Sequence, residues 1–191
     1  MDLLKRRIRN DGMAIGTEIV RVDSFLNHQL DIGLFMAIGK EIKRRFDHLG
    51  INKILTIESS GIAIASITAM YFDLPPVVFA ERIPLHAVTD EHYAAEITPS
   101  LTEIPSASCV LKAYLNKDDT VLILDSFLAH GEVTLGLCSL VEQAGGTVGG
   151  IVGIIEKEFQ GGSAKLREAG YYVDSLAVIT KIENGEVYFR D

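Results

Sequence analysis

The sequence contains no tryptophan and only two cysteines, so it offers little material for disulfide bonds. Cys109 and Cys138 are far apart and form no C-x-x-C pattern, which disfavours a disulfide framework and a redox motif. We expect both to be small, buried hydrophobic side chains in a reducing compartment. The sequence therefore predicts a cytoplasmic protein.

Long hydrophobic runs are also missing. The uncharged stretch 59–72 is interrupted by glycine and serine, and it is shorter than the ~20 apolar residues that cross a membrane. Residues 1–12 have no apolar segment followed by a cleavage site, so no secretory signal is predicted. Although the mean hydropathy is +0.23, we expect no membrane partner.

Basic side chains are in the minority. The chain has 18 lysines and arginines against 26 aspartates and glutamates, and its pI is about 5.1. A broad basic face that binds nucleic acid is therefore not expected. A phosphorylated small molecule is still compatible with this charge, since backbone N–H groups and a few local cations can hold it.

What is present is the composition of a globular protein. Hydrophobic residues make up 48% of the 191 residues, which excludes a disordered chain, and the length fits one domain over 1–191. Runs typical of strands alternate with segments of helical spacing. One such helix follows Asp31, and its apolar positions recur every four residues from Leu34 to Phe46. The main expected strands cover 53–57, 77–80, 120–124 and 148–155.

This alternation predicts an α/β fold, with a parallel sheet covered by helices on both faces. Residues 81–116 break the pattern, because prolines interrupt short extended runs there. We expect this segment to be a flap or an inserted hairpin with some strand content. Ligands of parallel sheets bind beyond the carboxyl ends of the strands, so the candidate site consists of the residues that follow each strand.

The segment after Leu124 is the most informative of these strand ends. Asp125 ends the expected strand, and a turn with Gly131 leads into a helix. The unpaired N–H groups at a helix start hold phosphate, and the acid can accept hydrogen bonds from a sugar diol. A simple capping role for Asp125 stays open. The turn at 58–61 repeats the arrangement, with an ordinary serine helix cap as the plainer interpretation.

Four segments carry a resemblance to a known family. Residues 121–135 resemble the phosphoribosyl-diphosphate motif of the type I phosphoribosyltransferases. Residues 22–29 (VDSFLNHQ), 56–63 (TIESSGIA) and 155–160 (IEKEFQ) are similar to signatures of the bacterial xanthine phosphoribosyltransferases within that family. The likeness extends over nearly the whole chain and is weakest between 81 and 116.

The resemblance implies a type I phosphoribosyltransferase-like fold, with a flap at about 81–116 and a small hood from both termini over the base. It implies purine salvage, in which the 5-phosphoribosyl group of phosphoribosyl diphosphate passes to N9 of xanthine. The products would be xanthosine 5′-monophosphate and diphosphate. Mg²⁺ would be held mainly by the diphosphate and the ribose hydroxyls rather than by a metal site of the protein. A homodimer is also implied.

The resemblance assigns one group of residues to the phosphoribosyl diphosphate. Asp125 would be the catalytic residue, facing the ribose hydroxyls and stabilising the positive charge that develops at C1′ as diphosphate leaves. The 5′-phosphate loop would consist of Ala129, His130, Gly131, Glu132 and Val133. Further contacts to this substrate would come from Ser59, Ser60, Gly61, Arg82 and Ser126.

A second group would contact the purine, namely Val20, Asn27, Phe127 and Lys157. The ammonium group of Lys157 would donate to a purine carbonyl, and the amide of Asn27 to the second carbonyl that distinguishes xanthine from guanine. From the residues alone, plainer interpretations stay open. They are a solvent-facing lysine, a turn asparagine, and core positions for Val20 and Phe127.

The motif departs from the family pattern at three positions. Ser126 stands in place of a second acid, Glu132 brings a negative charge into the phosphate loop, and Glu81 stands in place of a cation. We therefore keep as an alternative a catalytically weakened or inactive relative that binds a purine or nucleotide and acts as a regulatory protein. A dinucleotide dehydrogenase is disfavoured, since no G-x-G-x-x-G follows an expected strand. The segment after Glu81 is also acidic, with Asp90, Glu91, Glu96 and Glu103.

Overall fold

The order of helices and strands follows the alternation expected from the sequence. The computed structural model describes residues 1–97 and 106–191. Its helical elements are α1 (Asp2–Asp11), η1 (Asp23–Asn27), α2 (Ile32–Phe46), η2 (Asp47–Leu49), α3 (Ser60–Ala69), η3 (Leu85–Ala87), η4 (Lys112–Tyr114), α4 (Glu132–Gln143), η5 (Glu158–Gln160) and α5 (Gly162–Glu168). Its strands are β1 (Met13–Ile15), β2 (Ile19–Arg21), β3 (Lys53–Ile57), β4 (Val77–Pro84), β5 (His92–Ile97), β6 (Ser106–Leu111), β7 (Thr120–Leu128), β8 (Thr147–Lys157), β9 (Val173–Glu183) and β10 (Glu186–Phe189).

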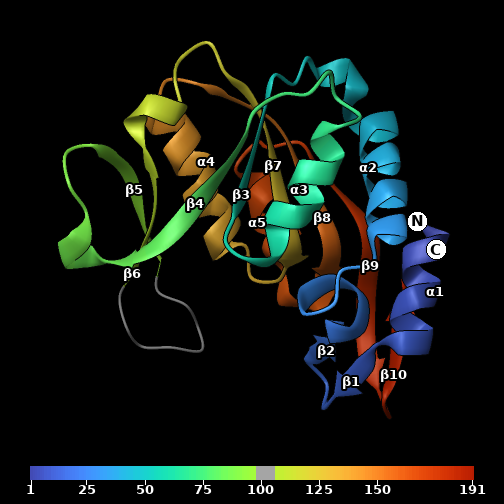
Figure 1. Cartoon of the computed structure of the whole chain (residues 1–191). Helices are drawn as coiled ribbons and strands as arrows, with labels where there is room; N and C mark the ends of the chain where they lie inside the picture. Colours follow the sequence, from blue (N-terminus) through green and yellow to red (C-terminus); the bar gives the residue numbers. More distant parts are fainter. Residues whose placement is uncertain (98–105) are drawn as a thin grey trace.

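The described residues form one sheet of eight strands, in the order β10-β9-β8-β7-β3-β4-β6-β5 (Figure 1). Its central strands, from β9 to β4 in that order, are all parallel. The outer strands are antiparallel to their neighbours, with β10 at one edge and β6 and β5 at the other. The predicted α/β fold is confirmed, and its parallel sheet is the centre of a mixed sheet.

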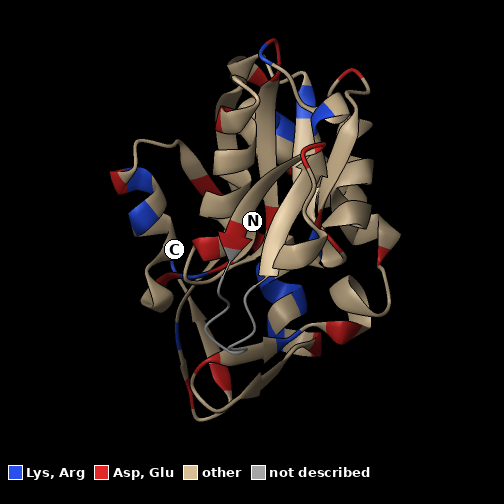
Figure 2. Ribbon diagram, turned by 90° about the vertical axis from the view of Figure 1, so that its left-hand side faces the viewer, with Lys and Arg blue, Asp and Glu red and all other residues tan. Residues whose placement is uncertain are grey.

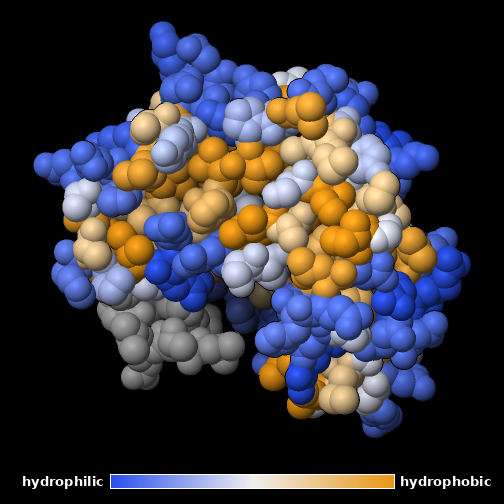
Figure 3. Space-filling view, viewed as in Figure 1, coloured by the Kyte–Doolittle hydropathy of each residue, from blue (hydrophilic) through white to orange (hydrophobic). Residues whose placement is uncertain are grey.

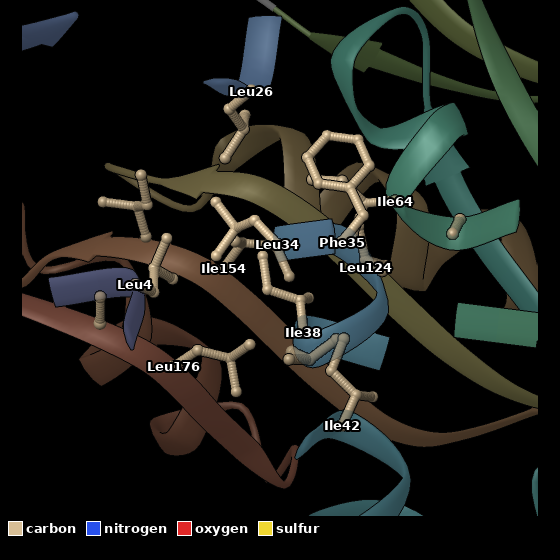
Figure 4. Packing of buried hydrophobic residues seen from close by; sticks show 14 of the residues in the cluster. Leu4, Leu26, Leu34, Phe35, Ile38, Ile42, Ile64, Leu124, Ile154 and Leu176 are labelled. Carbon is tan, nitrogen blue, oxygen red and sulfur yellow. The ribbon is translucent and has the colours of Figure 1, made fainter. Parts of the chain in front are cut away.

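Helices cover both faces of the parallel strands. On β7, Leu122 and Leu124 belong to a core shared with α1, α2 and α3, whereas Val121 and Ile123 belong to a core shared with α4 and α5. This alternation follows from the two-residue period of a strand. Figure 4 shows the first core, in which side chains of α2 and α3 lie against those of β7 and β8.

Helix α2 begins where its sequence predicts. The carboxylate of Asp31 accepts a hydrogen bond from the N–H of Leu34 at 2.9 Å and so caps the first turn. Ile38 and Ile42 are fully buried on its inner face. After η2 the chain turns at Gly50, whose φ of 63° lies in the left-handed region that favours glycine.

Strand β7 is longer than its sequence predicts. The expectation that it ends at Leu124 is wrong, because Asp125, Ser126 and Phe127 lie within the strand. Pairing with β8 continues to Leu128, which is opposite Glu156 and fully buried. Asp125 and Ser126 can be buried in the strand because both side chains have hydrogen-bond partners. Because the strand is longer, the turn with Gly131 starts four residues later than expected.

The segment 81–116 supplies the hairpin that was one of its two expected forms. Strand β4 continues past Ala80 to Pro84, because Glu81 and the residues after it pair with β6. Strands β5 and β6 then form an antiparallel pair that widens the sheet. Of the acidic positions noted above, Asp90, Glu91 and Glu96 are exposed, while Glu103 lies outside the described residues.

The N-terminal segment forms the expected hood. Strands β1 and β2 pair with each other, and the π-helical turn η1 follows. Phe25 and Leu26 of η1 are fully buried in the core that α2 also lines, which fixes the hood to the rest of the molecule. Figure 1 shows β1 and β2 beside the end of β10, so both ends of the chain contribute to this region.

Substitution of Gly61 tests how closely α3 starts against the sheet. An added Cβ would lie 1.9 Å from Oγ1 of Thr56, a buried hydroxyl that donates to the carbonyl of Leu124 at 2.8 Å. Because Thr56 cannot move away without losing this bond, we expect Gly61→Ala to lower the free energy of unfolding by about 1–3 kcal/mol in a urea titration.

Gly33→Ala is the matched control, since a Cβ there meets only Oδ1 of Asp31 at an ordinary 3.4 Å. We expect it to keep or raise the stability, because alanine favours a helix over glycine. The double variant Thr56→Ala/Gly61→Ala should lose less stability than the two single losses added together. A Gly61→Ala protein as stable as the unchanged chain would contradict the predicted clash.

Candidate active site

The ends of β3 and β7 bring two predicted residues into contact. The hydroxyl of Ser60, at the start of α3, lies 2.7 Å from the hydroxyl of Ser126 in β7. Ser59 precedes the helix, is exposed, and makes no side-chain capping hydrogen bond. The interpretation of these serines as ordinary helix caps therefore finds no support, and Ser60 instead links the two strand ends.

Asp125 is buried and hydrogen-bonded on both carboxylate oxygens. Its Oδ2 accepts from Oγ1 of Thr134 at 2.6 Å, and its Oδ1 accepts from the N–H of Phe127 at 3.0 Å. Burial raises the pKa of Asp125, and these two hydrogen bonds oppose that effect. The side chain thus ties β7 to the first turn of α4, as the plainer interpretation expected.

Thr134 is a residue that the sequence reasoning missed. It is fully buried and lies three residues after Gly131, in the first turn of α4. The only available signal was a hydroxyl residue at the start of the helix that follows the acid. Its partner is nine residues away in the sequence, and helical spacing gives no reason to expect that contact.

The segment 129–133 forms a tight turn into α4. Gly131 has a φ of 85°, and its carbonyl accepts the first helical hydrogen bond, from the N–H of Leu135 at 2.8 Å. The N–H groups of the residues between them have no helical partner at such a helix start, where the positive end of the dipole also lies. Glu132 is exposed, so its carboxylate is in contact with water. Ala129, His130 and Val133 are half-buried.

The segment after β4 places its charges at the surface. Glu81 and Arg82 are both exposed. The backbone N–H of Arg82 donates to Oε1 of Glu58 at 2.9 Å, so Glu58 braces the adjacent strand β4. The guanidinium of Arg82 carries the positive charge of strand β4.

Lys157 ends β8 and is tied to the hood. Its Nζ donates to the carbonyl of Glu18 at 3.2 Å, and the side chain is half-buried. Burial lowers the pKa of Lys157, and the carboxylate of Glu18 opposes that effect. The side chain is thus neither fully buried nor fully exposed to solvent. Because an ammonium group has three donors, the bond to Glu18 leaves two available to a ligand.

The other three purine positions lie in the same part of the molecule. Val20, in β2, is 7% exposed and belongs to the core, so its core interpretation is confirmed. Phe127 is half-buried against that core. Asn27 ends the η1 turn and is exposed, which leaves its amide free to meet a ligand. Figure 3 shows a hollow in the surface beside the hood.

A cavity lies away from these residues. It measures about 430 Å³ and is bounded mainly by apolar side chains of β4, β6 and η4. In residues 1–97 and 106–191, no group of three or more His, Cys, Asp and Glu side chains can hold a metal ion. Within the same residues, no helix is long and apolar enough to cross a membrane. Cys109 and Cys138 are both buried and unpaired, as predicted.

Acidic and basic residues are interspersed on the molecule. Figure 2 shows lysines and arginines scattered among aspartates and glutamates on the side that it presents. Several of the basic residues are neutralised by ion pairs, for example Arg45 with Glu41 and with Asp174. Over the described residues, the side that Figure 2 presents therefore shows no broad face of one charge sign.

Solved structures share this fold. The chain superimposes on adenine phosphoribosyltransferase from Rhodothermus marinus with a TM-score of 0.72 at 22% identity, over 91% of this chain and 95% of that one. It superimposes equally well, with a TM-score of 0.72 at 18% identity, on the adenine enzyme of Saccharomyces cerevisiae, covering 92% of this chain and 99% of that one. At these identities the likeness concerns the fold alone.

Curated sequences are more closely similar. No family model matches the chain. Xanthine phosphoribosyltransferase from Ruminiclostridium cellulolyticum is 48% identical over 191 residues, with both chains covered completely. Xanthine phosphoribosyltransferase 2 from Clostridium botulinum is 45% identical with the same complete coverage. Xanthine phosphoribosyltransferase from Oceanobacillus iheyensis is 41% identical, over 100% of this chain and 98% of that one. Full-length similarity at this level shows that the chain belongs to the xanthine phosphoribosyltransferase family.

Proposed function

We propose that this protein acts in purine salvage by transferring the 5-phosphoribosyl group of phosphoribosyl diphosphate to N9 of xanthine. The bond from C1′ to the diphosphate oxygen breaks, and its electron pair leaves with the diphosphate. The bond to N9 forms and the imidazole ring of xanthine releases a proton, giving xanthosine 5′-monophosphate and diphosphate. One observation carries the proposal. The glycine turn before α4 follows β7, and Lys157 is the last residue of β8, the parallel neighbour of β7. A phosphate subsite and a base subsite would therefore lie side by side.

The first step is binding of the phosphoribosyl group. The helix-start N–H groups after Gly131 hold the 5′-phosphate through hydrogen bonds and the helix dipole. Their donors belong to the backbone, so the exposed Glu132 side chain does not replace them. Asp125, held in place by Thr134, lies beside the ribose and stabilises the positive charge that develops at C1′.

The diphosphate occupies the neighbouring strand end. The hydroxyls of Ser59, Ser60 and Ser126 and the guanidinium of Arg82 donate to its oxygens, and the tight packing of Gly61 fixes the turn. Mg²⁺ would enter this site with the substrate, held mainly by the diphosphate and the ribose hydroxyls, since residues 1–97 and 106–191 contain no cluster of three or more His, Cys, Asp and Glu side chains that can hold a metal ion. When bound, Mg²⁺ neutralises charge on the leaving diphosphate.

The purine lies between Lys157 and the hood. Lys157 donates to one carbonyl of xanthine and the amide of Asn27 to the other, while Phe127 supplies an apolar contact to the ring. Val20 is a core residue and has no such role. A carbonyl at both positions matches two donors, whereas the amine of guanine does not. This arrangement favours xanthine over the other 6-oxo purines.

The chain acts as one domain over 1–191, in the cytoplasm, and as a homodimer. An exposed apolar surface supports self-association. The exposed large apolar side chains include Met70, Leu74, Phe79 and Tyr114, which are 42–74% exposed, and two of them, Phe79 and Tyr114, line the cavity between β4 and β6. Figure 3 shows hydrophobic side chains gathered across the middle of the face that it presents. Patches of this kind on a small protein mark contact sites for other chains.

Substitution of the base-reading lysine tests the proposed substrate. Loss of a charged hydrogen bond of about 1.5–3 kcal/mol predicts that Lys157→Met lowers kcat/KM for xanthine roughly 10- to 100-fold and leaves KM for phosphoribosyl diphosphate nearly unchanged. Lys165→Met, at an exposed position of α5, is the control. The unchanged chain could instead bind nucleotides without binding phosphoribosyl diphosphate or turning over. That result would contradict the proposal and favour the regulatory alternative.

Asp125→Asn separates catalysis from stability. The amide keeps the contacts to Thr134 and Phe127 but removes the charge, so we expect turnover to fall about 10²–10³-fold. Burial raises the folded-state pKa above the reference value of 3.8. The folded protein thus binds this proton more tightly, and its stability decreases as pH rises between those two values.

We therefore expect Asp125→Asn to be at least as stable as the unchanged chain at pH 7, and to show a weaker pH dependence in urea titrations from pH 4 upwards. Asp118→Asn, an exposed carboxylate, should alter neither turnover nor stability. Full turnover by Asp125→Asn would remove Asp125 from the mechanism.

Self-association is tested at Phe79, which is 42% exposed on β4. A charged side chain would be buried without a partner in an interface there, so Phe79→Glu should sediment as a monomer where the unchanged chain sediments as a dimer. Leu3→Glu alters a residue of similar exposure on α1, which packs at the other edge of the sheet. If the unchanged chain is monomeric at micromolar concentration, the dimer is wrong.

A further inference from the structure

Helix α5 lies directly against the phosphate loop, here defined as residues 129–133. The N–H of Gly162, the first residue of α5, donates to the carbonyl of Ala129 at 3.0 Å. A Cβ on Gly162 would lie 2.3 Å from that carbonyl oxygen and 2.7 Å from the backbone N of Gly131. The two segments therefore touch backbone to backbone, and no side chain fits between them.

The contact is equally tight from the other side. A Cβ on Gly131 would lie 3.1 Å from the Cα and 3.1 Å from the carbonyl oxygen of Gly162. Gly131 also has a φ of 85°, which already restricts that position to glycine. Two facing glycines thus set how far the phosphate loop can move toward α5.

A buried polar group holds the start of α5 in place. Glu156, in β8, is 1% exposed, and its Oε1 accepts a hydrogen bond from the hydroxyl of Ser163, the residue after Gly162. The same hydroxyl accepts from Arg167 at 3.1 Å, and Arg167 also donates to the carbonyl of Val173 at the start of β9. The first turn of α5 is therefore anchored to β8 and to β9.

The anchor starts at the base of the phosphate loop. Glu156 is paired across the sheet with Leu128, the last residue before that loop, and Lys157 follows it directly. Burying a carboxylate is costly unless its oxygens are hydrogen-bonded, and here only Oε1 of Glu156 has a partner, since Oε2 is buried without a hydrogen bond. An apolar residue would fill the same space without holding Ser163, so the carboxylate supplies direction rather than packing.

We propose that Gly162, held by the Glu156–Ser163 hydrogen bond, positions the phosphate loop for the 5′-phosphate. The inference rests on the proposed function, because it assumes that residues 129–133 bind this group. Gly162, Ser163 and Glu156 are positioning residues that do not touch the substrate. They hold the backbone of residues 129–133 on the side that faces α5, so that the N–H groups at the start of α4 converge on one point.

The test compares binding of xanthosine 5′-monophosphate with binding of xanthosine by calorimetry, since the ratio of the two affinities reports on the phosphate subsite alone. A small displacement of positioned groups has a large effect, so we expect Gly162→Ala to lower this ratio at least ~10-fold and to raise KM for phosphoribosyl diphosphate to a similar extent. KM for xanthine should change less than about twofold by the same reasoning.

Two further variants separate positioning from folding. Glu156→Gln keeps an oxygen that accepts from Ser163 and should retain the ratio, whereas Glu156→Leu removes the acceptor and should lower it. Gly149→Ala is the control for general destabilisation. A Cβ there would lie 2.7 Å from Cδ1 of Ile51 and 2.9 Å from Cγ2 of Thr120, outside the phosphate loop. It should lower stability and leave the ratio unchanged.

Each remaining outcome has one meaning. If the unchanged chain binds the monophosphate no better than the nucleoside, the phosphate loop itself is wrong, and the proposed function fails with it. If the unchanged chain discriminates and Gly162→Ala or Glu156→Leu discriminates equally well, the positioning role is wrong and the proposed function stands. An equal loss of discrimination in Gly149→Ala would assign the effect to destabilisation and would also overturn the inference.

Discussion

The hydrogen bond between Thr134 and Asp125 is the constraint on which the candidate site depends. It joins the end of β7 to the first turn of α4, so the loop between them has both ends fixed. The loop can then present its N–H groups without side chains of its own to stabilise it. The same bond keeps a buried carboxylate at the strand end, where an unsatisfied acid would be too costly to retain.

Much of the fold was predictable from local patterns. Asp31 and the four-residue apolar period predict helix α2, and β3 has the predicted bounds 53–57. The end of β7 was missed because Asp125 and Ser126 look like a turn when their partners in α3 and α4 are unknown. Strands β6 and β10 extend the sheet in an antiparallel direction, which no local pattern of residues encodes.

The candidate site divides in the same way. Position after a strand drew attention to Asp125 and Lys157, but their roles came from the resemblance to a family. Thr134 and Gly162 were not found, because each acts through a partner from another element. Glu156 was among the residues expected after a strand, but its partner Ser163 was not foreseen. The departures from the family pattern at Ser126 and Glu132 disturb the structure less than the sequence suggests. Ser126 gains a hydroxyl partner in Ser60, and Glu132 is exposed.

The bond from Lys157 to the carbonyl of Glu18 has a consequence for the energetics of base recognition. A free lysine side chain loses rotational freedom when it is immobilised, at a cost of about 0.5–1.5 kcal/mol in an interface. Here the hood has already immobilised the chain during folding, so that entropy is not lost again when a purine arrives. Under the proposed function, the N-terminal segment contributes to purine affinity by holding Lys157 in place, apart from any contact of its own with the ring.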